Sequence, residues 1–166
     1  MTRNDLLVFM RSHRYAVQSS VSQSGSPQSA VVGIAVGDDL SLVFDTLDST
    51  RKAQNLRRNP NIALVIGGLK PGDERTVQYE GIADEPHGEE LERTQHLYFA
   101  SFPDGPERQH WQGITYIRVR PTWIRYSDYN KNPPEIVEFD LERIRHLQHE
   151  HPDDVSAKET SSSTES

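Results

Sequence analysis

Residues 40–60 constrain the fold of this chain more than any other segment, because they combine two different periodicities. Residues 40–46 alternate along the chain in the manner of a β-strand. After a short polar turn, apolar residues recur at helical spacing, with Ser49 or Thr50 as a helix N-cap and Pro60 as a stop. The segment therefore predicts a strand, a turn and a short helix.

The predicted helix, residues 49–59, places two cations where the helix dipole is already positive. Arg51 and Lys52 lie in its first turn, where each cation costs about 0.3–1 kcal/mol unless an anion is bound. Free backbone N–H groups, the hydroxyls of Ser49 and Thr50 and the two cations together suit a phosphate. A solvated basic helix is the alternative interpretation.

Length and charge indicate one domain with a polar extension. We expect a folded domain over residues 1–148 and a disordered polar tail over residues 149–166, where no apolar period is visible. The net charge is −7, and the tail holds five acidic residues against one lysine, which leaves the folded part near −3. This balance argues against nucleic acid as a partner.

Cysteine is absent, which excludes disulfides, thiolate metal sites and cysteine nucleophiles. No apolar run approaches the length of a membrane span, and residues 6–10 are too short an apolar run for a signal peptide. We therefore expect no membrane association and a cytoplasmic location.

Short segments with strand character recur along the chain and are separated by turn residues. The predicted strands cover residues 15–21, 28–36, 40–46, 62–66, 75–84, 114–126 and 136–139. The first three are expected to form an antiparallel meander. Six or seven antiparallel strands with few helices predict a mainly β fold, a β-barrel with peripheral α-helices.

Single residues within these strands, and the segments between them, predict further features of the fold. Gly33 allows a close approach to the backbone, Gly81 marks a bulge, and Pro121 is expected to break the longest strand. Asn4 is a possible cap for a helix ending near Ser12. Further helices are expected over residues 87–102 and 141–148, with a loop over residues 103–113.

Several motifs within residues 14–121 together resemble one known family. The chain reads Ser-Thr-Arg-Lys-Ala at residues 49–53, followed by Asn-Pro and a predicted buried strand. The other segments that share the family's pattern are residues 27–33, 44–46, 56–65 and 77–83. This combination resembles the pyridoxamine 5′-phosphate oxidase-like family of FMN-binding split β-barrel proteins, in its short, general-stress-protein-like form. The fold that the resemblance implies is a split β-barrel.

The resemblance implies a homodimer with FMN at the subunit interface. Arg51 and Lys52 would bind the FMN phosphate, assisted by hydroxyls of Thr46, Ser49 and Thr50. The further cofactor-binding residues that it implies are Val31, Val32 and Gly33, whose backbone would face the flavin, Thr76 or Gln78 near the ring, and Trp123 from the partner subunit.

Aromatic residues are candidates for the surface buried in that dimer. These candidates are Tyr79, Trp123 and Tyr126. Arg125 and Tyr129 extend the same aromatic and basic cluster, and strand-end packing is the alternative interpretation of the cluster. A small dimer of this kind would hold a small-molecule substrate next to the flavin.

The chain departs from the oxidase proper at two places. Gln28 or Ser29 stands where the oxidase has a strand arginine, and residues 141–146 lack its substrate-gripping C-terminal motif. The expected function is an FMN-dependent oxidoreductase that transfers hydride between the flavin and an unassigned small molecule. The alternative is a non-catalytic protein that binds flavin, F420 or haem with a sensor, storage or stress role.

Histidines outside these motifs do not indicate a metal site. His146, His149 and His151 lie around the start of the predicted tail, where solvated side chains are expected, so no metal ligands are assigned. His110-Trp111 is a candidate cap for a flavin pocket, although a packing role is expected for Trp111. No set of residues is assigned a catalytic role.

Overall fold

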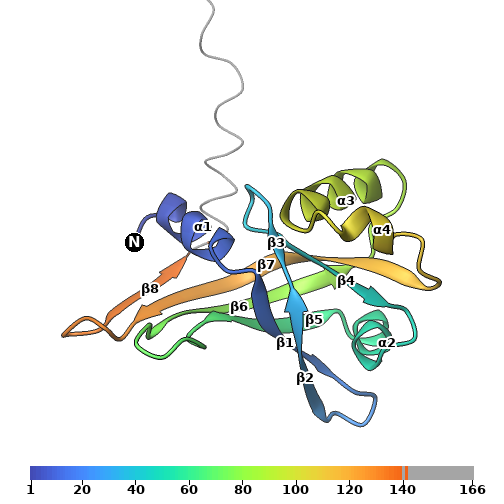
Figure 1. The fold of residues 1–166 in the computed structure, drawn as a ribbon. Helices are drawn as coiled ribbons and strands as arrows, with labels where there is room; N and C mark the ends of the chain where they lie inside the picture. Colours follow the sequence, from blue (N-terminus) through green and yellow to red (C-terminus); the bar gives the residue numbers. More distant parts are fainter. Residues whose placement is uncertain (140, 142–166) are drawn as a thin grey trace, which may run out of the picture.

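A computed structural model describes residues 1–139 and 141 of the chain. Within these residues eight strands and four helices follow one another (Figure 1). Their bounds are α1 Arg3–Arg11, β1 Tyr15–Val21, β2 Pro27–Gly33, β3 Ala35–Val36, β4 Leu42–Leu47, α2 Arg51–Arg58, β5 Asn61–Gly67, β6 Arg75–Asp84, α3 Glu89–Ser101, α4 Gly105–Arg108, β7 Ile114–Asp128 and β8 Glu135–Phe139. The predicted tail and, apart from Leu141, the predicted terminal helix lie outside the described residues.

The strands form one antiparallel sheet that curls into a barrel. Its order is β2-β1-β5-β6-β7-β4-β3, and β8 adds to β7. The two ends of this order, β2 and β3, are separated along the chain by Ile34 alone, so the sheet has to curl until its ends meet. The predicted mainly β, split-barrel fold is confirmed.

The two antiparallel pairings of the predicted three-stranded meander are confirmed, but its middle strand is not continuous. Residues 28–36 form two strands, because β2 pairs with β1 whereas β3 pairs with β4. The other neighbour of β1 is β5, and that of β4 is β7. Alternation along residues 28–36 defines the two faces of the segment but does not reveal the interruption at Ile34, which explains the eighth strand.

Side chains on the inner face of the barrel form the main core, and they include Tyr79 and Tyr126. Tyr79 is 1% exposed, and its hydroxyl lies 3.0 Å from the carbonyl oxygens of both Leu40 and Val119, which share its one proton. Tyr126 is 3% exposed and packs edge-on against Phe9. The expectation that these two tyrosines lie on a dimer surface is therefore wrong, since both are buried within one subunit.

Helix α1 packs its apolar side against this core, with Leu6, Leu7, Phe9 and Met10 buried as its sequence pattern indicates. Its cap is Thr2 rather than Asn4. The Thr2 hydroxyl accepts from the Asp5 amide, and the Asp5 carboxylate accepts from the Thr2 amide, so the two form a capping box. None of the helices in the described part of the chain is long and apolar enough to cross a membrane.

The predicted bulge at Gly81 is present, and it keeps β7 continuous through Pro121. Glu80 pairs with Trp123 and Gly81 with Pro121, so β7 carries one extra residue at this point. A Cβ on Gly81 would lie 2.6 Å from the Arg120 carbonyl oxygen. The predicted break at Pro121 is wrong, because a bulge is one of the places where a sheet accommodates proline.

Helices α3 and α4 lie together on the outside of the barrel (Figure 1). Helix α3 packs on β3, β4 and β7 through a second apolar cluster that includes Val43, Tyr98, Phe102 and Tyr116. The predicted helix over residues 87–102 is confirmed in substance, whereas the expected loop over residues 103–113 contains the short helix α4.

Candidate functional site

Two threonines hold the start of α2 in place. Thr50 is the N-cap, and its hydroxyl accepts from the Ala53 amide at 3.4 Å. The same hydroxyl donates to the Leu47 carbonyl at 2.8 Å and lies 3.0 Å from the Thr46 hydroxyl. Because Thr50 has given its only hydroxyl proton to Leu47, Thr46 is the donor in that last contact. The turn between β4 and α2 is therefore rigidly defined.

This helix start presents two cations without partners. Arg51 is exposed and Lys52 is half-buried, and the first turn of α2 contains no acidic residue. Within residues 1–139 and 141, neither side chain makes a hydrogen bond or an ion pair. By contrast, Arg57 in the same helix is paired with Glu85. Two unpaired cations beside free helix N–H groups form a site that favours an anion.

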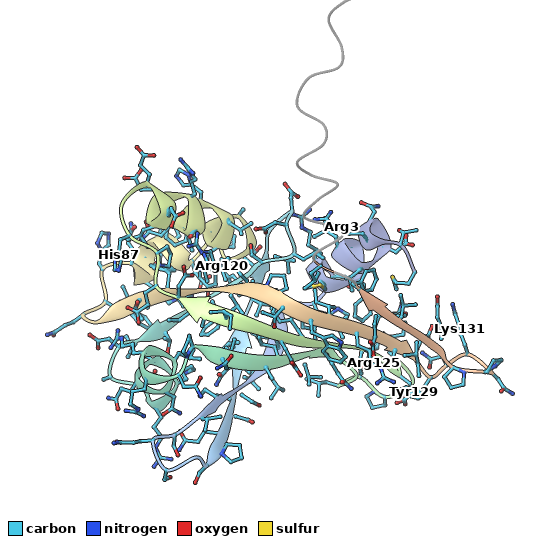
Figure 2. All side chains as sticks on the ribbon, turned by 180° about the vertical axis from the view of Figure 1, so that it is seen from behind. Arg3, His87, Arg120, Arg125, Tyr129 and Lys131 are labelled. Atoms are coloured by element: carbon cyan, nitrogen blue, oxygen red, sulfur yellow. The ribbon has the colours of Figure 1, made fainter. Side chains whose placement is uncertain are left out.

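The outer face of the sheet carries a row of apolar and polar side chains in register. Val31 of β2 lies opposite Val17, Val17 opposite Val65, and Val65 opposite Gln78. Gln78 in turn lies opposite Arg125 of β7. Arg125 is labelled in Figure 2. Val31 is 63% exposed and Val65 is 40% exposed. The two exposed valines give this outer face an apolar stripe that runs from β2, at one end of the strand order, to β5.

The predicted cofactor residues fall into two groups. Thr46, Ser49, Thr50, Arg51 and Lys52 gather at the start of α2. Val31, Thr76, Gln78 and Trp123 lie on the outer face of the sheet, with Trp123 directly opposite Glu80. Val32 differs from the rest, because its side chain is 5% exposed and belongs to the main core.

Gly33 is approached closely by Phe102, at the C-terminal end of α3. A Cβ on Gly33 would lie 2.7 Å from Cζ of Phe102, so a larger residue here would force the ring to shift. The Arg14 guanidinium lies over the same Phe102 ring, 4.5 Å from its centroid. The sequence predicts that some group approaches the backbone closely at Gly33, and within this subunit that group is the Phe102 ring.

A polar cluster beside Thr46 was missed by the sequence analysis. The Tyr98 hydroxyl donates to Oδ1 of Asp45 at 2.8 Å, and Nε of Arg108 donates to Oδ2 at 3.1 Å. Burial raises the pKa of Tyr98, and its hydrogen bond to Asp45 raises it further. These contacts tie α3 and α4 to β4, directly before the turn that leads into α2. Tyr98 and Arg108 lie 53 and 63 positions from Asp45 along the chain, so spacing could not reveal the cluster.

The tyrosine opposite Asp45 adds an unusual group to this cluster. Tyr116 is 4% exposed, and burial raises its pKa. The Gln95 side chain is the polar group beside its hydroxyl, and it acts to lower that pKa. Chemically the cluster is a set of fixed donors around one carboxylate, and it gives the structure a rigid border next to the anion site.

Other predicted candidates are placed differently. Trp111 is 56% exposed, so the packing role expected for it is wrong within one subunit. The histidines at positions 146, 149 and 151 lie outside the described residues. Across residues 1–139 and 141, no three histidine or acidic side chains are grouped in a way that could hold a metal ion.

Comparison with known proteins gives consistent matches at the level of sequence. Residues 4–128 match the family described as pyridoxamine 5′-phosphate oxidase. The chain is 36% identical over 126 residues to the pyridoxine/pyridoxamine 5′-phosphate oxidase of Burkholderia mallei (strain SAVP1). The match covers 70% of this chain but only 56% of that relative, so the chain spans little more than half of the curated protein.

Solved structures match over most of the chain with low identity. The general stress protein 26 of Bacillus anthracis has a TM-score of 0.62 with 21% identity, covering 84% of this chain and 100% of that one. A heme binding protein from Mycobacterium smegmatis has a TM-score of 0.70 with 15% identity, covering 86% of this chain and 66% of that one. At these identities the likeness shows a shared fold.

Proposed function

The chain belongs to the pyridoxamine 5′-phosphate oxidase family, and from this premise we propose that it binds FMN and transfers hydride between the flavin and a small molecule. The observation that carries the proposal is the unpaired pair Arg51 and Lys52 at the start of α2. A phosphate dianion there would offset both cations and accept from the free helix N–H groups.

The residues of this chain fit a phosphorylated flavin in two places. Arg51, Lys52 and the hydroxyls of Ser49 and Thr50 would hold the phosphate. The row from Val31 to Gln78 would lie against the ring system, because exposed valines suit an apolar ring and the Gln78 amide offers both a donor and an acceptor. When bound, FMN supplies the redox chemistry, and the protein supplies orientation and exclusion of water.

A second subunit completes this site in our proposal. The exposed valines of the outer face need cover, and a homodimer with the cofactor at its interface would provide it. Trp123 and Arg125 lie on the same face of the sheet and would border the flavin from the partner subunit. A small substrate would then enter between the two subunits.

Haem is the second candidate, because a structural neighbour is described as a heme binding protein. The propionates of a haem would be attracted to Arg51 and Lys52 as a flavin phosphate would be. The chain would then act as a binding or storage protein without turnover. A deazaflavin with a phosphorylated chain, such as F420, would use the same two cations.

The absorbance spectrum of the purified protein, before and after adding FMN, F420 or haem, distinguishes the three cofactors. We expect a stoichiometric flavin spectrum that is bleached anaerobically by NAD(P)H or by a substrate amine. A haem Soret band in place of the flavin bands would overturn the FMN assignment. A bound flavin that no reductant in the panel bleaches would favour a binding role over an oxidoreductase.

A further inference from the structure

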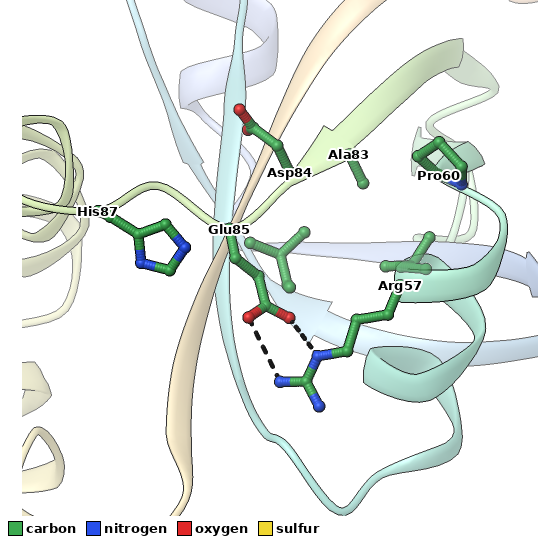
Figure 3. Close-up of a pocket in the computed structure, with 8 residues that line it drawn as sticks. Arg57, Pro60, Ala83, Asp84, Glu85 and His87 are labelled. Atoms are coloured by element: carbon green, nitrogen blue, oxygen red, sulfur yellow. Dashed lines mark hydrogen bonds and ion pairs between the residues drawn. The ribbon is translucent and has the colours of Figure 1, made fainter.

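The C-terminal half of α2 borders a pocket that the cofactor proposal does not use. It has a volume of about 380 Å³ and lies between α2, the ends of β5 and β6, the connection to α3, and β7. We call it the α2–β6 pocket. Figure 3 shows the Arg57 guanidinium joined to the Glu85 carboxylate at its rim, with the His87 ring beyond. Its volume suits a molecule of one or two rings.

The floor of the pocket is apolar. Leu56, Ala83 and Ile117 line it, and their exposed fractions are 5%, 7% and 1%. These side chains also belong to the main core, so the floor is held rigidly by the barrel. A flat apolar ring would gain contact area there without a rearrangement of the protein.

The rim of the pocket is charged but balanced. Arg118 donates to both oxygens of Asp84 at 3.0 and 2.6 Å, and Arg120 pairs with the same carboxylate at 3.1 Å. Arg118 also reaches Glu90 at 3.1 Å. Two carboxylates, Asp84 and Glu85, line the pocket, and Arg57 is the lining arginine. Glu85 is paired with Arg57, and Asp84 is paired with two arginines of β7 that lie outside the lining. Because each lining carboxylate already has a cationic partner, the pocket favours neither a charged amine nor a charged acid.

The rim nevertheless keeps donors and acceptors for a neutral ligand. Arg57 uses Nε and Nη2 for Glu85, at 2.7 and 3.3 Å, and Nη1 for the Asp48 carbonyl at 3.4 Å. A guanidinium has five N–H groups, so one remains on each terminal nitrogen. Each Glu85 oxygen accepts one of these bonds and retains a lone pair. Within the described chain, the His87 imidazole makes no hydrogen bond or ion pair.

We propose that the α2–β6 pocket binds an uncharged planar heterocycle that carries an N–H group next to a C=O group. The ring lies on Leu56, Ala83 and Ile117, the C=O group accepts from Arg57, and the N–H group donates to Glu85. This site is separate from the anion site at the start of α2, and it stands whether or not the chain binds FMN.

The test uses matched xanthines on the full chain. 1,3-Dimethylxanthine has an N–H group beside a C=O group, and 1,3,7-trimethylxanthine has a methyl group in place of that hydrogen. We expect the first to bind with a dissociation constant on the order of 0.1–1 mM and the second at least about fivefold more weakly. Quinoline-2-carboxylate and 2-(aminomethyl)quinoline, charged two-ring molecules of similar size, are expected to bind negligibly. Ligand-observed NMR measures all four.

Two variants and one methyl signal localise the binding. Ala83→Leu fills the floor and should abolish xanthine binding, whereas Arg57→Lys keeps the charge but loses the forked donors and should weaken binding roughly fivefold. Arg93→Lys, on the exposed side of α3, is the matched control and should bind as wild type does. The Ile117 methyl signal should shift on titration, which tests the site even if Ala83→Leu does not fold.

Several results would overturn the proposal. They are stronger binding of either charged quinoline, equal binding of the two xanthines, an unmoved Ile117 methyl signal, or full binding by a folded Ala83→Leu variant. The titration is repeated with excess FMN. If FMN removes xanthine binding while Ala83→Leu retains it, the heterocycle occupies the proposed cofactor site, and the α2–β6 pocket is not its site.

Discussion

Replacing Arg51 with alanine tests the phosphate assignment directly. The Arg51 side chain is exposed and has no hydrogen-bond or ion-pair partner among the described residues, so the substitution removes no contact within the subunit. It removes only a cation from the positive end of α2. The free energy of unfolding of the apo protein should therefore stay constant or rise by up to about 0.5 kcal/mol.

The expected effect on FMN is larger. A charge-assisted hydrogen bond to a phosphate contributes roughly 1.5–3 kcal/mol, which corresponds to about tenfold to a hundredfold in affinity. Because Arg51 is exposed and its charge is partly screened, we expect a loss near tenfold. Lys52→Ala should cost less, since an ammonium group lacks the forked geometry of a guanidinium.

The assay is a fluorescence titration of FMN and of riboflavin into wild type and variants, with melting curves of each apo protein. Riboflavin has no phosphate, so its weak binding should be nearly the same in all variants. Arg93→Ala removes a cation from the exposed side of α3 and controls for net charge. Equal losses for FMN and riboflavin, or a clear fall in apo stability, would refute the phosphate assignment.

Three further predictions concern packing, assembly and pH. Gly33→Ala should cost about 1–3 kcal/mol of unfolding free energy in urea, because its Cβ would meet the Phe102 ring, and Phe102→Leu should restore part of the loss; additive losses would contradict the contact. Val31→Asp should shift a dimer toward monomer in sedimentation at micromolar concentration, whereas Val8→Asp, on the exposed side of α1, should not; an unchanged dimer would exclude this face as the interface. Burial acts to raise the pKa of Asp84, but its arginine partners on β7 outweigh that effect and hold the pKa below its usual range. The stability that Asp84 contributes should therefore be present above its unfolded pKa and be lost as the pH falls below about 4. Asp84→Asn should flatten this acid loss in melting curves, and an identical pH profile would contradict the assignment.

The sequence by itself determined the elements that local chemistry controls. Strand alternation predicted the mainly β fold, the helical spacing after Thr50 predicted α2, and Gly81 predicted the bulge. The two cations of the candidate anion site were also visible, because a helix start and the residue types in its first turn are local features. These signals depend only on neighbours along the chain.

Only the tertiary structure decided which distant residues meet. Alternation shows which side chains share a face of the strand with Tyr79. It does not show that this face points into the interior of the same barrel. Two contacts join residues more than fifty positions apart: the Phe102 ring lies over Gly33, and the Tyr98 hydroxyl forms a hydrogen bond with Asp45. The partners of a strand follow from how the whole sheet closes, and that closure is set by packing of the entire core rather than by any local pattern.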